Sequence, residues 1–228
     1  MSAPTVPAAR KRRFDYRVVL WLGVILGVGL AVRVYGLGGQ SVWWDDYNGL
    51  VGLRENNLAS AVRESLRVNP EAVPFYFVVQ YIVSRVTGTS PEALRLLSVL
   101  FGLLTIPVVY LLGRDTFGKR AGLVAALMLA LSPIHVFHDQ SIRLYPLLVL
   151  LACLAMWTMS RALRRGSGWR WWLLNVVLNT LLIWTHLLAL ALVVAEAVAA
   201  MLFVRRHGRR VLVWGVLQAL LILPSAVY

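Results

Sequence analysis

Long apolar stretches alternate along the chain with short polar segments that are rich in arginine. The apolar stretches cover residues 18–32, 93–113, 121–136, 146–159, 171–204 and 211–228. A helix needs about 20 residues to cross the roughly 30 Å hydrocarbon core of a bilayer, so runs of this kind are typical of membrane helices. The pattern therefore predicts an all-α fold, a polytopic membrane helical bundle.

Two stretches depart from the length of a single crossing. Residues 171–204 would form about 51 Å of helix, too long for one span, so we expect a hairpin whose turn lies near Thr185 and His186. Residues 73–83 are apolar but too short to cross, which favours a re-entrant or interfacial helix. Residues 57–67 place their apolar side chains on one face of a helix, which predicts a short helix lying along the membrane surface. With these assignments we expect about seven transmembrane helices and one re-entrant helix.

Basic clusters orient these helices. Arginine and lysine concentrate before residue 18 and at residues 114–120, 161–170 and 205–210, and one assignment puts all four clusters on the cytoplasmic side. Residues 1–17 are then a basic cytoplasmic N-terminus, and residues 18–228 are a transmembrane domain whose first external loop covers 38–92. Because the last apolar run ends without a polar tail, we also expect truncation at the C-terminus. The predicted location is the inner or plasma membrane.

Composition supports a membrane protein and argues against two other classes. Hydrophobic residues make up 59% and charged residues 14% of the 228 residues, more apolar surface than a soluble core of that size needs. The net charge of +13 would suggest nucleic acid for a soluble domain, but the basic residues follow membrane topology, so no nucleic-acid partner is expected. The single cysteine, Cys153, excludes a disulfide framework.

An acidic pair stands soon after the first apolar run, in the sequence SVWWDDYNGL. Asp45 and Asp46 would each cost roughly 2.5 to 3.5 kcal/mol at the bilayer centre, so we expect them at or beyond the membrane surface. Trp43 and Trp44 suit that depth because indole rings prefer the headgroup region. A solvated loop is the simpler interpretation of the pair, and Asp46 could alternatively cap the following surface helix, residues 57–67.

Further polar residues from distant segments fall on the same outer side in this topology. They are Asn69, His138, Asp139, Gln140, Arg143, Tyr145, Thr185 and His186. Their convergence would form one outward-facing cavity at the depth of lipid headgroups. Simpler roles stay open: Arg143 could pair with Asp139 in a helical turn, and His138 and His186 could be interfacial hydrogen-bonding residues rather than metal ligands. Glu196 lies mid-span and must be paired or face a cavity.

Four sequence blocks carry a resemblance to a known family. SVWWDDYNG follows the first span and NPEAVPFYFVVQYIVSRVTG comes next. ALRLLSVLFGLLTIPVVYLLGRDTFGKRAGLVAALMLALSPIHVFHDQSIRLYP forms the middle, and WTHLLALALV comes later. In this order they resemble the N-terminal part of the GT-C membrane glycosyltransferases, in the bacterial branch related to protein O-mannosyltransferases and to aminoarabinose transferases of lipid A. The resemblance covers nearly all of residues 33–203.

The resemblance implies an integral-membrane glycosyltransferase that moves a sugar from a polyprenyl-phosphate-sugar donor to an extracytoplasmic acceptor, which is a protein, a lipid or a glycan. In such enzymes an acidic pair, usually Asp-Glu, lies in the first external loop and its Asp is thought to act as base. Asp45 and Asp46 are therefore the expected catalytic residues, although the second acid here is Asp. Asn69 and Pro70 stand where the family commonly has His-Pro-Pro. The expected substrate-binding residues are Asp139, Gln140, Arg143, Tyr145 and His186.

The chemistry of such a transfer assigns two roles. One carboxylate must take a proton from the acceptor hydroxyl, and the leaving phosphate needs a cation or hydrogen-bond donors. Asp45 is the candidate base and Arg143 the candidate phosphate clamp. No metal ligand is assigned and no cofactor is expected with certainty, although a divalent metal is left open. A lipid-linked-sugar transporter or flippase and an inactive assembly subunit are the alternatives to an enzyme.

Overall fold

The computed structural model describes residues 15–39 and 41–227, and the regular elements in that part of the chain are helical. They are α1 (Tyr16–Val34), α2 (Trp44–Leu50), η1 (Val51–Arg54), α3 (Leu58–Val68), α4 (Phe75–Thr87), α5 (Pro91–Phe117), α6 (Lys119–Ala130), α7 (Pro133–Asp139), α8 (Tyr145–Ala162), α9 (Trp169–Ile183), η2 (Leu187–Ala189), α10 (Leu190–Leu202), α11 (Val204–Ile222) and η3 (Leu223–Val227). Apart from an isolated antiparallel bridge between Ala72 and His186, the described residues contain no β-structure. The all-α fold class is confirmed.

Three helices are long and apolar enough to cross a membrane: α1 with 19 residues, α5 with 27 and α8 with 18. The pair α6 and α7 would be a fourth crossing if it forms one bent span. The apolar helix over Leu187–Leu202 is shorter. Within the described residues there are thus three or four candidate spans by length and composition, and the count of about seven stays a prediction.

The run 121–136, expected as one span, contains a break. α6 and α7 are bent by 59° relative to one another. Pro133 begins α7 and has no N–H to continue a helical ladder, while the Ser132 hydroxyl accepts the first hydrogen bond of α7, from the His135 N–H at 3.5 Å. The Ala130 carbonyl instead accepts a hydrogen bond from Arg33 Nη1 at 2.9 Å. The bend brings the polar side chains of α7 next to α1.

Other predicted elements lie where the sequence indicates them. The stretch 171–204 forms two helices that are separated by a turn at residues 184–189, close to the expected turn at Thr185 and His186. The short apolar run 73–83 falls in α4, which has 13 residues. Asn57 begins the predicted surface helix, α3, because its side chain accepts a hydrogen bond from the Ser60 N–H at 2.9 Å.

The mid-span carboxylate of Glu196 is paired, as expected for an ionisable group in an apolar helix. Its Oε2 accepts hydrogen bonds from Asn175 Nδ2 at 3.0 Å and from Asn179 Nδ2 at 2.7 Å. Asn175 also accepts a hydrogen bond from Trp214 Nε1 at 2.7 Å. This buried network joins α9, α10 and α11.

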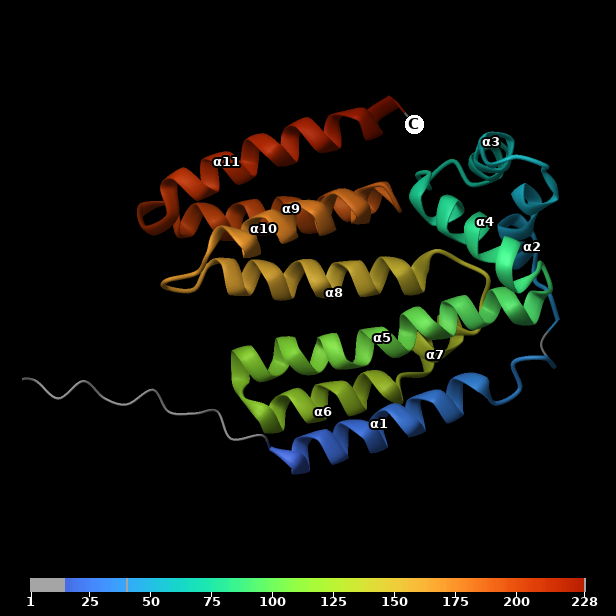
Figure 1. Ribbon diagram of the computed structural model, residues 1–228, viewed down its shortest axis with the longest axis horizontal. Coiled ribbons are helices and arrows are strands. Elements are labelled where there is room, and N and C mark those ends of the chain that lie inside the picture. The colour runs from blue at the N-terminus through green and yellow to red at the C-terminus, as the bar shows by residue number, and fades with distance from the viewer. Residues whose placement is uncertain (1–14, 40, 228) are drawn as a thin grey trace, which may run out of the picture.

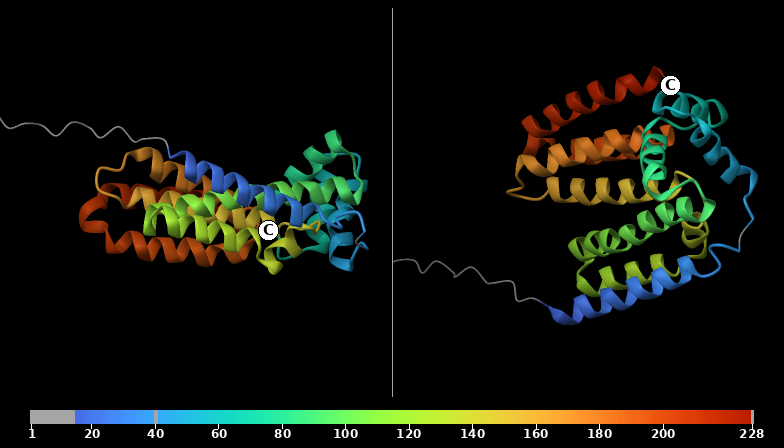
Figure 2. Two further views of the ribbon diagram at one scale, coloured as in Figure 1. Left: turned by 90° about the horizontal axis from the view of Figure 1, so that it is seen from below. Right: turned by 45° about the vertical axis from the view of Figure 1, so that its right-hand side comes forward.

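The long helices run side by side, and the shorter polar elements collect at the ends of the bundle. Figure 1 shows α2, α3, α4 and α7 toward the right-hand end, and the further views in Figure 2 keep this grouping. The turns after α5, α8 and α10, which contain the predicted basic clusters, lie at the opposite end. The two groups of polar residues are therefore separated by the length of the bundle, while the membrane side of each stays a prediction.

Candidate active site

Arg143 lies where three distant segments meet. It sits in the loop between α7 and α8, and only 11% of its side chain is exposed. Its Nη1 donates hydrogen bonds to Asn69 Oδ1 at 2.9 Å and to the Asp45 carbonyl at 3.3 Å. Its Nη2 lies 3.8 Å from Glu71 Oε1. The loop of the acidic pair, the loop before α4 and the loop before α8 thus converge on one guanidinium.

One edge of this guanidinium is left without hydrogen bonds. The Nε atom of Arg143 is buried and has no hydrogen-bond partner among the described residues. Its Nη2 makes the 3.8 Å contact with Glu71, which exceeds hydrogen-bond length. The Tyr145 ring flanks the group, with its centroid 5.6 Å from the guanidinium carbon. The Nε–Nη2 edge presents two adjacent donors, the geometry that phosphate oxygens accept.

The two carboxylates of the acidic pair have opposite environments. Asp46 is buried: its Oδ2 accepts a hydrogen bond from Arg95 Nη2 at 3.1 Å, and its Oδ1 accepts one from the Ile142 N–H at 2.9 Å. Asp45 is exposed, and no other described residue binds its carboxylate. The alternative that Asp46 caps the following surface helix is wrong, because Asn57 caps that helix, α3. Of the pair, Asp45 is the one whose carboxylate is open to solvent and to a bound substrate.

The backbone that carries the acidic pair is held firmly. Arg95 also donates hydrogen bonds to the carbonyls of Leu37 at 3.0 Å and Ser41 at 3.1 Å, which lie in the loop before α2. A Cβ on Gly49 would lie 2.4 Å from the Ile142 carbonyl oxygen, so glycine is required for α2 to approach the loop after α7. These contacts fix the position of the loop while leaving the Asp45 side chain free.

His186 lies beside the loop that carries Glu71. The two segments are joined by the Val73 N–H, which donates to the Thr185 carbonyl at 3.3 Å. His186 Nδ1 accepts a hydrogen bond from the Leu188 N–H at 3.1 Å, so the neutral ring carries its proton on Nε2. Burial lowers the pKa of His186, and the nearby Glu71 carboxylate partly opposes that shift. The ring is thus a neutral Nε2–H donor at pH 7.

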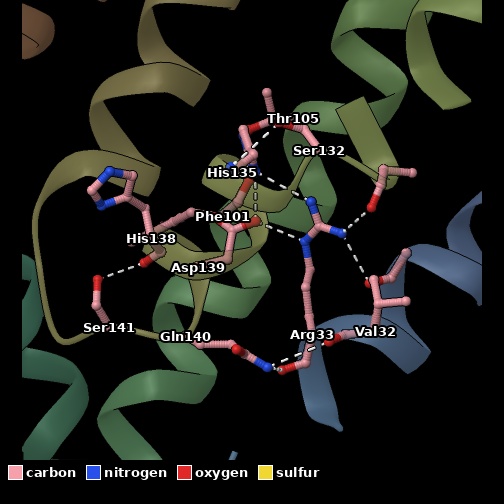
Figure 3. A network of polar contacts seen from close by, with 12 residues as sticks. Val32, Arg33, Phe101, Thr105, Ser132, His135, His138, Asp139, Gln140 and Ser141 are labelled. Carbon is pink, nitrogen blue, oxygen red and sulfur yellow. Dashed lines mark hydrogen bonds and ion pairs between the residues drawn. The ribbon is translucent and has the colours of Figure 1, made fainter. Parts of the chain in front are cut away.

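Asp139 belongs to a buried network that joins α7 to α1 (Figure 3). Arg33 Nε donates a hydrogen bond to Asp139 Oδ2 at 2.7 Å, and both side chains are almost fully buried. His135 Nδ1 lies 2.6 Å from the same oxygen. The alternative that Asp139 pairs with Arg143 in a helical turn is wrong, because α7 ends at Asp139 and the carboxylate faces Arg33.

Gln140 and Tyr145 contact neighbouring parts of the site. Gln140 Nε2 donates a hydrogen bond to the Arg33 carbonyl at 3.0 Å (Figure 3) and another to the Tyr35 carbonyl, also at 3.0 Å. The Tyr145 ring meets the His138 ring edge to face, with the centroids 5.0 Å apart. A cavity of about 330 Å³ opens beside His138 and Tyr145, and its other walls are largely apolar side chains of α6, α7 and α8.

Comparison with known proteins decides the family. A family profile described as dolichyl-phosphate-mannose-protein mannosyltransferase matches residues 69–228, more than two thirds of the chain. The chain belongs to this mannosyltransferase family. The matched region contains Asn69, Arg143 and His186, whereas Asp45 and Asp46 precede it. The predicted resemblance to GT-C glycosyltransferases is thereby confirmed at the level of the family.

A sequence relative points to the same family. The protein named "Putative mannosyltransferase YkcB" of Bacillus subtilis (strain 168) is 31% identical over 94 residues, a match that covers 41% of this chain and 13% of that protein. The matched part is therefore a small fraction of the relative. No solved structure matches the chain significantly.

Three charged residues of this mannosyltransferase-family site escaped the sequence analysis. Arg33 and Arg95 stand inside or beside apolar runs, where an ionisable side chain must find a partner, and that rule alone could have marked them. Their partners, Asp139 and Asp46, could not be derived, because the pairings span 106 and 49 residues. Glu71 gave no signal, since one acid in a polar loop is ordinary.

Nowhere in the described ranges do three or more His, Cys, Asp and Glu side chains form a group that could hold a metal ion. His135, the histidine nearest a carboxylate, lies 3.2 Å from the Arg33 guanidinium, whose positive charge opposes a cation there.

Proposed function

We propose that this protein transfers a sugar from a polyprenyl-phosphate-sugar donor to a hydroxyl-bearing acceptor outside the cytoplasm. Family membership supports the class of reaction. The observation that carries the proposal is the position of Arg143. One edge of its guanidinium makes no hydrogen bond and suits a phosphate, while its Nη1 binds the backbone carbonyl of the exposed Asp45. A candidate phosphate-binding group and a candidate base are thereby held together.

In the proposed reaction Asp45 acts as the general base. Its carboxylate takes the proton of the acceptor hydroxyl as that oxygen attacks the anomeric carbon. The bond from the anomeric carbon to the phosphate oxygen breaks, and its electron pair stays on the polyprenyl phosphate. Arg143 stabilises the charge that develops there through its Nε and Nη2 donors. Asp46 acts as a positioning residue, because it holds α2 against Arg95 and the loop before α8.

The other site residues receive different tasks in this proposal. His186 and Tyr145 offer an N–H and a hydroxyl donor to the sugar or its phosphate. Asp139 and Gln140, which the sequence suggests as substrate ligands, instead position the loop that carries Arg143, since Asp139 Oδ2 already binds Arg33 and Gln140 Nε2 already binds neighbouring carbonyls. Glu71 is a second carboxylate near Arg143, and it is the competing candidate for the base.

Two single substitutions, assayed side by side, distinguish the two carboxylates. Asp45→Asn and Glu71→Gln are expressed at equal levels, and membranes are assayed with a panel of radiolabelled polyprenyl-phosphate sugars. We expect Asp45→Asn to lower kcat about 10² to 10⁴ fold, the usual contribution of a general base. Glu71→Gln should keep most of the activity. The opposite pattern would make Glu71 the base. Full activity in both variants would show that neither carboxylate acts as the base.

The phosphate role of Arg143 has its own test within the same assay. Arg143→Lys keeps the positive charge but loses the paired donors, so we expect the KM for the donor to rise about tenfold, with a further rise in Arg143→Gln. An unchanged donor KM in both variants would contradict the phosphate-clamp role.

The transporter alternative gains no support from the position of Glu196. Transporters place ionisable groups of the midplane along a substrate path. Here one oxygen of Glu196 is held by two asparagine side chains of the adjacent helix α9. We therefore assign the carboxylate to helix packing.

A further inference from the structure

A second concave surface lies at the end of the bundle opposite the proposed active site. A cavity of about 590 Å³ is formed by the turn between α8 and α9 and by the start of α11. Its lining consists of Arg165, Arg206, Arg209, Arg210, His207 and two glycines. Four arginines, one from the turn between α8 and α9 and three from the start of α11, thus line one hollow, which we call the arginine pocket.

The arginine pocket carries positive charge without compensation. Residues 161–170 and 205–210 contain eight arginines and no acidic residue. Asp115, at the end of α5, is already bound by Arg114 at 2.8 Å and by Arg161 at 3.2 Å. None of the four pocket arginines forms an ion pair with another described residue. Like charges held in one hollow repel one another, so an anion would be bound favourably there.

The backbone adds to this preference. His207 has φ −125° and ψ 18°, which breaks α11 and makes residues 208–222 a helix of their own. The first turn of that helix carries Arg209 and Arg210, and the N-terminal end of a helix attracts anions through its unpaired N–H groups and its dipole. The break is held in place because His207 is buried, with Nε2 3.2 Å from the Leu163 carbonyl oxygen.

The surroundings of the arginine pocket favour a lipid over a free anion. Apolar side chains next to the pocket residues in sequence are exposed: Trp169 at 38%, Phe203 at 38% and Val204 at 47%. A soluble phosphate would leave them in contact with water, whereas a lipid would cover them with its glycerol and acyl chains. Arg210 also stacks over Trp169, with 5.7 Å between guanidinium carbon and ring centroid. We propose that the arginine pocket binds the phosphate-bearing headgroup of an anionic membrane phospholipid.

A lipid bound here would connect α11 to the turn between α8 and α9 and so stabilise the fold. Thermal unfolding measures that stabilisation. The purified protein in a neutral detergent is titrated with phosphatidylglycerol, phosphatidylcholine or inorganic phosphate, and the unfolding midpoint is recorded. We expect phosphatidylglycerol to raise the midpoint in a saturable manner. Phosphatidylcholine and inorganic phosphate should have little effect at the same concentrations. An equal effect of inorganic phosphate would replace the lipid with a soluble anion, and an equal effect of phosphatidylcholine would refute recognition of the anionic headgroup.

Two variants localise the effect to the pocket. Arg206→Gln with Arg209→Gln should raise the half-saturating concentration of phosphatidylglycerol about tenfold or more. The control, Arg17→Gln with Arg120→Gln, removes the same charge from α1 and α6 at the same end of the bundle and should change it much less. Equal losses in both double variants would mean diffuse surface charge and would overturn the proposal.

A further variant leaves the charge unchanged. No atom lies within 4 Å of a Cβ placed on Gly208, so a side chain at this position of the pocket lining begins in open space, and we expect Gly208→Leu to fill part of the pocket. We expect this variant to unfold normally without lipid but to lose much of the stabilisation by phosphatidylglycerol. Full lipid stabilisation in Gly208→Leu would place the headgroup elsewhere.

Discussion

At the residue scale, identical side chains receive different chemistry from their surroundings. Asp45 and Asp46 are adjacent, yet one carboxylate is exposed and the other is buried against Arg95. Asp139 resembles Asp46, because it is buried against Arg33. An ion pair of this kind holds the carboxylate in one direction, which suits the positioning of other groups rather than contact with a substrate. The exposed Asp45 is not held in this way.

This contrast predicts very different losses of stability for two substitutions that remove the same charge. Asp139→Asn leaves the Arg33 guanidinium buried without a counter-charge, so we expect it to lower the free energy of unfolding by about 3 to 5 kcal/mol. Asp45→Asn should change it by less than about 0.5 kcal/mol, because the side chain is exposed. The measurement is unfolding in mixed micelles titrated with a denaturing detergent.

The double variant Arg33→Met with Asp139→Leu provides the control for this prediction. Removing both charges together should restore most of the lost stability, since neither is left unpaired. Equal stability of Asp139→Asn and the wild type would show that the pair contributes nothing to the fold.

At the element scale, close helix packing depends on glycine where α5 and α6 meet. A Cβ on Gly113 would lie 2.9 Å from Gly122 Cα, and a Cβ on Gly122 would lie 2.6 Å from the Tyr110 carbonyl oxygen. The nearest atoms belong to the backbone and cannot rotate away. Small residues are the means by which helices approach one another in membranes, where apolar lipid weakens the hydrophobic driving force. The same contact sets the direction of α6 and, through the bend at Pro133, the position of α7.

Gly122→Ala is therefore predicted to destabilise the bundle by about 1 to 3 kcal/mol, because α6 must move away from α5. Gly27→Ala is the matched control: no atom lies within 4 Å of its Cβ, and the higher helix propensity of alanine should stabilise α1 by up to about 1 kcal/mol. Unfolding midpoints of the two variants should move in opposite directions. A loss of similar size in both would indicate a general intolerance of alanine rather than close packing.

At the scale of the whole molecule, the sequence predicts the helices better than the bends and contacts between them. Apolar periodicity and length predicted the all-α class, the hairpin over 171–204 and the surface helix after Asn57, since these follow from local composition. The bend between α6 and α7 was missed, although Ser132 and Pro133 form a cap and a helix start that could have indicated it. The number of membrane spans stays open beyond three or four candidates.

The candidate site shows the same division. Residue type and order singled out Arg143, His186 and the acidic pair, but nothing local distinguishes the exposed Asp45 from the buried Asp46. That difference arises from Arg95, which is 49 residues away in the sequence. Likewise, Glu71 enters the site only through the fold of the loop before α4. Contacts that depend on long-range folding are therefore the part that sequence patterns could not supply.

The separation of polar ends leads to a prediction about membrane sidedness. The turns that contain the basic clusters lie at one end of the bundle, and α2, α3 and α4 lie at the other (Figure 1). If arginine-rich turns face the cytoplasm, a cysteine at exposed Thr116 is protected from an impermeant thiol reagent in intact cells, whereas one at exposed Asn56 reacts. The native Cys153 is buried, so it adds little background. Permeabilised cells should label both positions, which controls for accessibility. Labelling of Thr116→Cys in intact cells would reverse the orientation, and the proposed transfer would then have to take place on the cytoplasmic side.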